Sequence, residues 1–291
     1  GYVIILSYII INIMFVSGDN FNKLSTVSIY ERKYYNDFIK HNQIQNVLFV
    51  GENNNTLLDS IKNKKNIFFL KVETIDYFMK VIIPHLNEKF VIITHNGDLC
   101  SGKNIVLLNH PLLVRWYGQN MDNMSDKTVG IPIGLENKIW KRVNFTLLQS
   151  FSKQPKTKLM YLNFSCHTNP GRKKIMQYFL NNGFTKNESL PWNQYIEDLS
   201  HYKFALSPFG YGADCHRTWE CLYLNVIPIV VHSNPMKHFT DLPILFVRYL
   251  DDINPAFLEK TYDKYFKNKQ FHLDKLDMSY WQNEIHNDLY K

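Results

Sequence analysis

The sequence predicts an α/β fold built from two Rossmann-like halves whose parallel sheets face each other across a cleft. Short, continuously apolar runs alternate with helical patterns along most of the chain, which is typical of strands buried in a parallel sheet. A polar stretch at residues 153–158 interrupts this alternation, and the pattern starts again at residues 159–162. The 291 residues, 45% of them apolar, are enough for two modest domains.

The N-terminal half, residues 19–151, begins with a polar stretch and continues as strand–helix repeats. Residues 23–43 are polar, with an amphipathic pattern only around residues 30–39. Beyond them, apolar runs indicate strands, and apolar residues one helical turn apart indicate the helices between them. We expect strands at residues 46–51, 67–72, 90–94, 105–108 and 129–133, and helices at residues 56–63, 75–83 and 111–117.

The C-terminal half, residues 152–257, repeats the alternation of strands and helices, with clearer turns between them. We expect strands at residues 159–162, 203–206, 227–231 and 245–247, and helices at residues 171–182, 193–201 and 214–225. The remaining tail, residues 258–291, is polar and aromatic. We expect it to be helical and to fold back on the first half.

The first residues of the chain suggest targeting. Residues 1–18 carry no charge, and residues 2–16 are almost entirely apolar. This run is short for a membrane span and suits the core of a signal peptide, with the small residues Ser17 and Gly18 at the cleavage point. A membrane signal-anchor and a buried N-terminal strand or helix are the alternatives. We expect a secretory protein of the ER or Golgi lumen, and Asn-x-Ser/Thr sequons that such a protein could use begin at Asn54, Asn123, Asn144, Asn163 and Asn187.

Composition excludes several classes of protein. The net charge of +7 is moderate and favours an anionic substrate such as a nucleotide sugar, or an acidic membrane surface. No Lys/Arg run or nucleic-acid motif is present, so we expect no nucleic-acid partner. The 4 cysteines are too few for a disulfide scaffold. Cys215 and Cys221 do not have the spacing of a zinc site, so we interpret them as buried thiols and expect no metal.

The stretch from Phe204 to Val231 is the most informative part of the chain. It indicates a strand that stops at a Ser-Pro turn, a loop containing Gly210 and Gly212, a helix, and a second buried strand. The glycines would allow positive φ angles and close approach of a ligand. Asp214 is the expected N-cap of the helix, because its carboxylate can accept a hydrogen bond from a free helix N–H.

Two charged side chains lie on one face at the start of this helix. Arg217 would bring a bidentate donor to the helix N-terminus, which suits a phosphate. Glu220, one turn later, would accept hydrogen bonds from sugar hydroxyls. The alternative is that Arg217 and Glu220 form only an i,i+3 surface ion pair. The surrounding loop and strands favour the ligand-binding interpretation.

The motif resembles the C-terminal half of exostosin-type glycosyltransferases. The resemblance is carried by Ser207-Pro, Gly210-Tyr-Gly212, Arg217-Thr-Trp-Glu220 and the Ile-Pro-Ile-Val run at residues 227–230. It implies the GT-B architecture, with the nucleotide-sugar donor on the second domain and the acceptor on the first. The donor-binding residues that it implies are Arg172, Ser207, Gly210, Gly212, His216, Arg217 and Glu220.

Candidate catalytic residues follow the strands of the first half. His95, Asp98 and Glu136 all lie just beyond such strands, and Asp98 is the preferred base because an Asn-Gly turn precedes it. Asp214 is its rival if the carboxylate points at the sugar. Arg115, with its neighbour Trp116, is a candidate for the acceptor surface, although a tryptophan there is more often core packing.

The functional prediction is a metal-independent glycosyltransferase. It would move a hexosyl or pentosyl group from a UDP- or GDP-linked donor to a hydroxyl of a glycan or glycoprotein, without a further cofactor. A catalytically inactive nucleotide- or sugar-binding module is the alternative. A nicotinamide-dependent oxidoreductase is disfavoured, because no GxGxxG follows a first strand.

Overall fold

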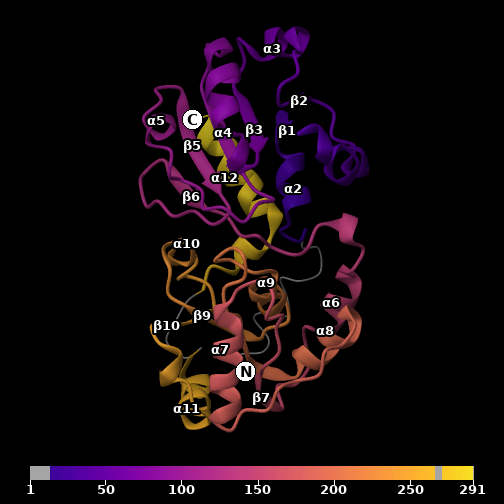
Figure 1. Cartoon of the computed structure of the whole chain (residues 1–291), viewed down its shortest axis with the longest axis vertical. Helices are drawn as coiled ribbons and strands as arrows, with labels where there is room; N and C mark the ends of the chain where they lie inside the picture. Colours follow the sequence, from indigo (N-terminus) through magenta and orange to yellow (C-terminus); the bar gives the residue numbers. More distant parts are fainter. Residues whose placement is uncertain (1–13, 266–270, 291) are drawn as a thin grey trace.

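The computed structural model describes residues 14–265 and 271–290, and it shows an α/β protein with two sheets, one of six strands and one of four. Every strand pair is parallel. The six-stranded sheet lies in the upper part of Figure 1 and the four-stranded sheet in the lower part. Two all-parallel sheets are consistent with the predicted Rossmann-like α/β class.

The first sheet has the strand order β2-β1-β3-β4-β5-β6. Its strands are β1 (Val27–Tyr30), β2 (Val47–Phe49), β3 (Asn66–Leu70), β4 (Phe90–Thr94), β5 (Leu113–Gly118) and β6 (Thr128–Gly130). The helices of this half are α2 (Gly18–Lys23), η2 (Arg32–Tyr34), η3 (Tyr35–Lys40), α3 (Asn55–Ile61), η4 (Val72–Thr74), α4 (Ile75–Tyr77), η5 (Phe78–Ile82), η6 (Ile83–His85), α5 (Ile105–Leu108), η7 (Lys138–Trp140) and α6 (Phe145–Phe151).

Two predictions in this half are wrong, and one strand was missed. Residues 105–108 form helix α5 instead of a strand, because the Asn104 side chain accepts a hydrogen bond from Leu107 N–H and caps the helix. Residues 113–118 form strand β5 instead of a helix, with Trp116 fully buried in the sheet. Strand β1 lies inside the stretch that looked polar, and its Ser28 hydroxyl is satisfied by donating to Asn22 Oδ1 (2.6 Å).

The second sheet has the order β10-β9-β8-β7, and its strands match the predicted ones. They are β7 (Lys158–Tyr161), β8 (Tyr202–Leu206), β9 (Ile227–Val231) and β10 (Leu245–Val247). The helices of this half and the tail are α7 (Gly171–Asn181), α8 (Trp192–Ser200), α9 (His216–Tyr223), α10 (Asn234–Lys237), η8 (Leu250–Asp252), α11 (Pro255–Tyr265), η9 (Leu273–Leu276) and α12 (Met278–Tyr290).

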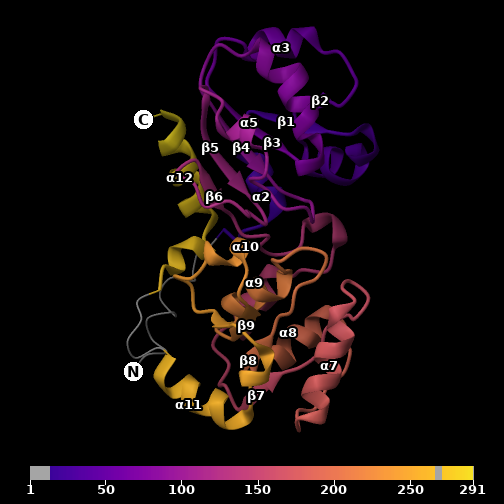
Figure 2. The same ribbon diagram turned by 60° about the vertical axis from the view of Figure 1, so that its left-hand side comes forward.

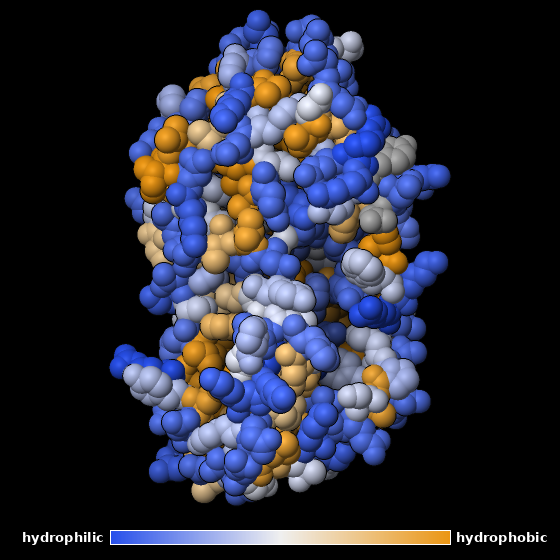
Figure 3. Space-filling model, in the orientation of Figure 1, coloured by the Kyte–Doolittle hydropathy of each residue, from blue (hydrophilic) through white to orange (hydrophobic). Residues whose placement is uncertain are grey.

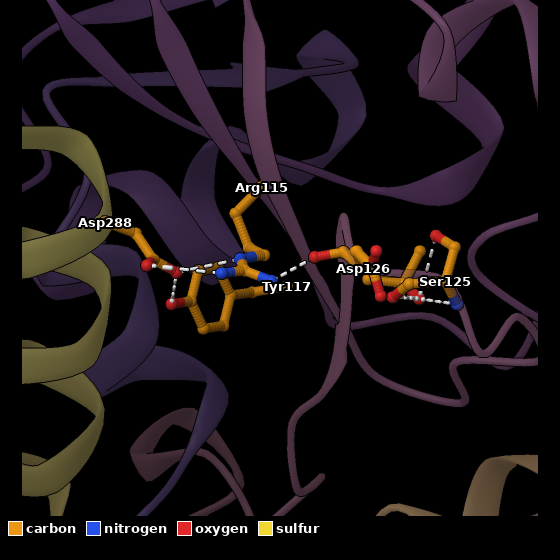
Figure 4. A network of polar contacts seen from close by, with 6 residues as sticks. Arg115, Tyr117, Ser125, Asp126 and Asp288 are labelled. Atoms are coloured by element: carbon orange, nitrogen blue, oxygen red, sulfur yellow. Dashed lines mark hydrogen bonds and ion pairs between the residues drawn. The ribbon is translucent and has the colours of Figure 1, made fainter. Parts of the chain in front are cut away.

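Only the last part of the predicted tail, helix α12, folds back on the first half. Figures 1 and 2 show α12 running alongside the first sheet, whereas α11 stays beside the second. The buried side chains of α12, Trp281 among them, join the core that covers one face of β3 and β4. Asp288 of α12 accepts hydrogen bonds from Arg115 Nε (2.9 Å) and Tyr117 OH (2.6 Å), as Figure 4 shows. Arg115 therefore holds the tail. The buried Trp116 packs in the core, whereas the acceptor role of Arg115 stays a prediction.

The end of the predicted leader is part of the fold. Residues 1–13 lie outside the described residues, but Phe15, Val16 and Ser17 are buried. Val16 N–H donates to Tyr223 OH (2.9 Å), and Val16 O accepts from Leu135 N–H (2.8 Å). Among the residues described, no helix is long and apolar enough to cross a bilayer.

The face in Figure 3 is mainly hydrophilic with separate apolar patches. The lumenal location stays a prediction.

Candidate functional site

The two halves meet where the carboxyl ends of their strands bring loops together. The Asp214 carboxylate, just before α9, accepts from Ile133 N–H (2.7 Å), and Asp214 N–H donates to Asn120 Oδ1 (3.0 Å). His216, the first residue of α9, donates from Nδ1 to Gly134 O (2.8 Å). The loop and helix of the most informative motif thus face the segment that follows β6. The ends of parallel strands are where α/β proteins hold their ligands.

Arg217 lies in a polar and aromatic pocket of the second half. Its Nε donates to Tyr195 OH (3.2 Å), and its Nη1 donates to Asn163 O. The guanidinium lies 5.4 Å from the ring centre of Tyr195 and 5.8 Å from that of Tyr161. Nη2 makes no hydrogen bond within the described part of the chain, and it is not among the enclosed polar atoms. This atom therefore keeps an unused donor.

Glu220 does not pair with Arg217. It is buried, and its Oε1 accepts from Trp192 Nε1 (2.9 Å) while its Oε2 accepts from Tyr195 OH (2.8 Å). Tyr195 thus links the two charged residues by donating to one and accepting from the other. The surface ion-pair alternative is wrong, because this network replaces the direct contact. Both carboxylate oxygens already have partners, so Glu220 positions Tyr195 in the structure as it stands.

Arg172, the second phosphate candidate, braces two loops. Its Nε donates to Phe209 O (2.7 Å), its Nη1 to Ser165 O (3.0 Å), and its Nη2 to Pro208 O (2.6 Å). These bonds tie the loop after β7 to the loop after β8. Burial is the main reason that the pKa of Arg172 lies below its usual value, and the positive charge of Arg217 acts in the same direction. The two guanidinium groups therefore lie close enough for their charges to interact.

The positive charge at this place has no direct carboxylate partner in the described structure, because the Glu220 carboxylate reaches Arg217 only through Tyr195. Across residues 14–265 and 271–290, neither Arg172 nor Arg217 forms an ion pair with a carboxylate. The Thr168 hydroxyl oxygen nearby is buried and has no hydrogen-bond partner in the described structure. A Cβ added at Gly210 would lie 3.3 Å from Arg172 Nη2 and 3.6 Å from Thr168 Oγ1, so all three are neighbours. An unpaired donor beside the Arg172 cation is the environment that an anion would complete.

The glycines and Ser207 act differently from the prediction. Neither Gly210 nor Gly212 has a positive φ. Gly212 is needed because a Cβ there would lie 2.6 Å from Asn120 Nδ2, so it allows the halves to approach. Ser207 is buried, and its hydroxyl shares a hydrogen bond with Thr218 Oγ1 (2.9 Å). Ser207 therefore fixes the start of the loop, and its contact with a donor stays a prediction.

The two predicted catalytic carboxylates have different surroundings. Asp214 does not cap α9, whose N-cap is Cys215. It is buried, it accepts from Trp219 Nε1 (2.8 Å) as well as from the first half, and burial raises its pKa to about 7. Asp98 is exposed on the loop after β4, and only its backbone oxygen contacts the junction, by accepting from Asn120 Nδ2 (3.4 Å). Neither carboxylate is hydrogen-bonded to the arginines.

Of the two candidate histidines, His95 is enclosed and His216 is accessible. His95 is buried; it accepts at Nδ1 from Asn96 N–H (2.8 Å) and donates from Nε2 to Pro132 O (3.0 Å). Burial lowers the pKa of His95 to about 4, so this imidazole stays neutral. His216 uses only Nδ1, and Nε2 is not among the enclosed atoms. Glu136, two residues beyond the His216 contact, is half-buried, and burial raises its pKa.

The cysteines and the cavity lie apart from this chemistry. All 4 cysteines are free, and burial raises the pKa values of Cys215 and Cys221. Within the described ranges, no group of three His, Cys, Asp or Glu side chains is placed to hold a metal ion. A cavity of about 500 Å³ lies at the other end of the first sheet, against Lys64, Lys65 and Tyr290. We place the site at the junction instead, because the unpaired donors lie there.

The sequence interpretation missed the aromatic residues of the site. Trp192 and Tyr195 hydrogen-bond to Glu220, and Tyr161 stacks near Arg217. The available signal was the i,i+3 spacing of Trp192 and Tyr195 on a helix whose buried face is carried by Ile196 and Leu199.

Comparisons with known proteins do not add a family. No protein-family model matches the chain, and no curated protein matches it in a sequence search.

Proposed function

We propose that this chain is a glycosyltransferase that moves a sugar from a nucleoside-diphosphate donor to a hydroxyl of a glycan or protein. The observation that carries the proposal is the pair of guanidinium groups, Arg172 and Arg217, that lack a carboxylate partner among the described residues. Accessible Nη2 of Arg217 and the unpaired Thr168 hydroxyl add donors at the same place. The diphosphate of such a donor carries the complementary charge and acceptors.

The two-sheet arrangement supports this proposal without deciding it. In the proposed GT-B arrangement the donor occupies the second half, beside α9, and the acceptor approaches from the first half. Arg172 and Arg217 would stabilise the charge that develops on the departing diphosphate. Glu220 contributes by orienting Tyr195, and through it Arg217, instead of binding sugar hydroxyls directly.

Titration calorimetry with UDP and GDP tests the nucleotide site. We expect Arg217→Met to weaken nucleoside-diphosphate binding by roughly tenfold or more, about 1.4 kcal/mol, because the accessible donor and its charge are lost. Arg32→Met is the matched control, since Arg32 is exposed and paired with Glu52 in the first half. Equal affinity of wild type and Arg217→Met, or binding of neither nucleotide, would refute the assignment.

A binding module without catalysis is the second candidate. It is favoured by one observation: neither predicted catalytic carboxylate, Asp98 or Asp214, is hydrogen-bonded to the arginines. Such a module would bind the nucleotide and release no product, so a turnover assay separates the two candidates.

A further inference from the structure

His216 is oriented so that one ring nitrogen is free. A carbonyl oxygen can only accept a hydrogen bond, so the contact with Gly134 O (2.8 Å) places the hydrogen on Nδ1. In the neutral imidazole, Nε2 is then the unprotonated nitrogen. Nε2 makes no hydrogen bond within the described residues and is not an enclosed atom. The carbonyl oxygen of Gly134 in the first half therefore leaves Nε2 of His216 able to accept a proton.

The neighbours of His216 suit proton transfer. Arg217, with its accessible Nη2, is the next residue along the chain. Glu136 lies close enough for a charge interaction with His216: burial raises the Glu136 pKa most, and a positive charge on His216 would lower it.

The two buried candidates for the base, His95 and Asp214, are occupied. His95 uses both ring nitrogens and is buried. Asp214 accepts from a backbone N–H of the first half and from Trp219, and it too is buried. His216 is the junction imidazole in the described structure that combines a fixed tautomer with an accessible acceptor.

We infer that His216 is the catalytic base of the proposed sugar transfer, with Arg217 holding the leaving group; this rests on the proposed function. In this step Nε2 of His216 takes the proton of the acceptor hydroxyl. The hydroxyl oxygen forms a bond to the anomeric carbon of the donor sugar as the bond from that carbon to the diphosphate oxygen breaks. The electron pair leaves with the nucleoside diphosphate, next to Arg217, and the proton on His216 is later lost to solvent.

Two variants separate a base from a structural residue. His216→Asn keeps an N–H that can donate to Gly134 O but has no nitrogen equivalent to Nε2. His216→Ala removes the ring and leaves space for added imidazole. His85→Asn is the matched control, because His85 is exposed on η6. Each protein is assayed for kcat and KM with the donor that it consumes, and for UDP and GDP affinity by calorimetry.

We expect His216→Asn to lower kcat by roughly 100-fold or more while nucleotide affinity stays within about twofold of wild type. Added imidazole should restore part of the kcat of His216→Ala. Wild-type kcat in His216→Asn, or loss of kcat in His216→Ala without rescue, would overturn the role of His216. Wild-type kcat in His216→Asn would overturn the base and leave the proposed transferase standing, whereas a wild-type protein that never turns over, or that binds no nucleotide, would overturn the proposed function with it.

Discussion

Arg172 and Arg217 have the same side chain and different tasks. Arg172 donates to three backbone oxygens and locks two loops, so its substitution should disturb the shape of the site. Arg217 keeps Nη2 free and stacks near two tyrosines. The sequence motif identified both residues as phosphate candidates. It could not show that Arg172 uses its N–H donors in hydrogen bonds to the protein backbone, because the accepting oxygens lie on loops distant in sequence.

Asp214 and His95 are buried at the junction and shift the pH dependence of stability in opposite directions. The folded-state pKa of Asp214, about 7, exceeds its usual 3.8, so its contribution is present below pH 3.8 and is lost as pH rises to about 7. The folded-state pKa of His95, about 4, lies below its usual 6.5. Its contribution is therefore present above pH 6.5 and is lost as pH falls to about 4.

Urea unfolding of two variants separates these contributions. Relative to wild type, we expect the stability of Asp214→Asn to rise more steeply with pH between pH 4 and 6.5, because the opposing contribution of Asp214 is gone. His95→Gln should show the reverse slope. The change across the full range is on the order of 3 to 4 kcal/mol for each residue. Identical slopes in the two variants and wild type would show that folding does not shift the pKa of either Asp214 or His95.

Most elements were predictable because their apolar pattern is local. Strands β3, β4, β8 and β9 are mostly buried apolar runs, and Asn54 and Asn144 cap helices α3 and α6. The strand prediction at residues 105–108 is wrong for a physical reason. Four apolar residues suit either a strand or one helical turn, and the N-cap at Asn104 favours the helix. Strand β1 was missed because Ser28 and the polar residues around it are satisfied by contacts that only the fold creates.

In the loop between β8 and α9, the structure requires Gly212 for close packing of the two halves and not for a positive φ angle. We expect Gly212→Ala to destabilise the protein by about 1–3 kcal/mol, since its Cβ would meet Asn120, which Asp214 N–H holds in position. Gly97→Ala is the control, because its new Cβ would have no neighbour closer than 3.4 Å. Equal free energies of unfolding for the two variants would show that the halves do not need this close approach.

At the scale of the whole molecule, the site depends on contacts between distant segments. His216 reaches Gly134, Asp214 reaches Ile133, and Tyr223 reaches Val16. Local sequence patterns do not predict contacts between such distant residues. The accessible nitrogen of His216 could therefore be recognised only in the structure. The helix α12 adds a further link, since it leaves the second half and packs against the first sheet.

Release of nucleoside diphosphate from a panel of UDP- and GDP-linked sugars, with a mixed glycan acceptor, tests most directly whether the chain transfers sugar. We predict that wild type consumes at least one donor and yields a product in which the sugar is bound to the acceptor. His216→Asn should bind the same donor and release nucleotide roughly 100-fold more slowly. Wild-type protein that binds nucleotide but releases none from any donor would contradict a transferase and leave a binding module.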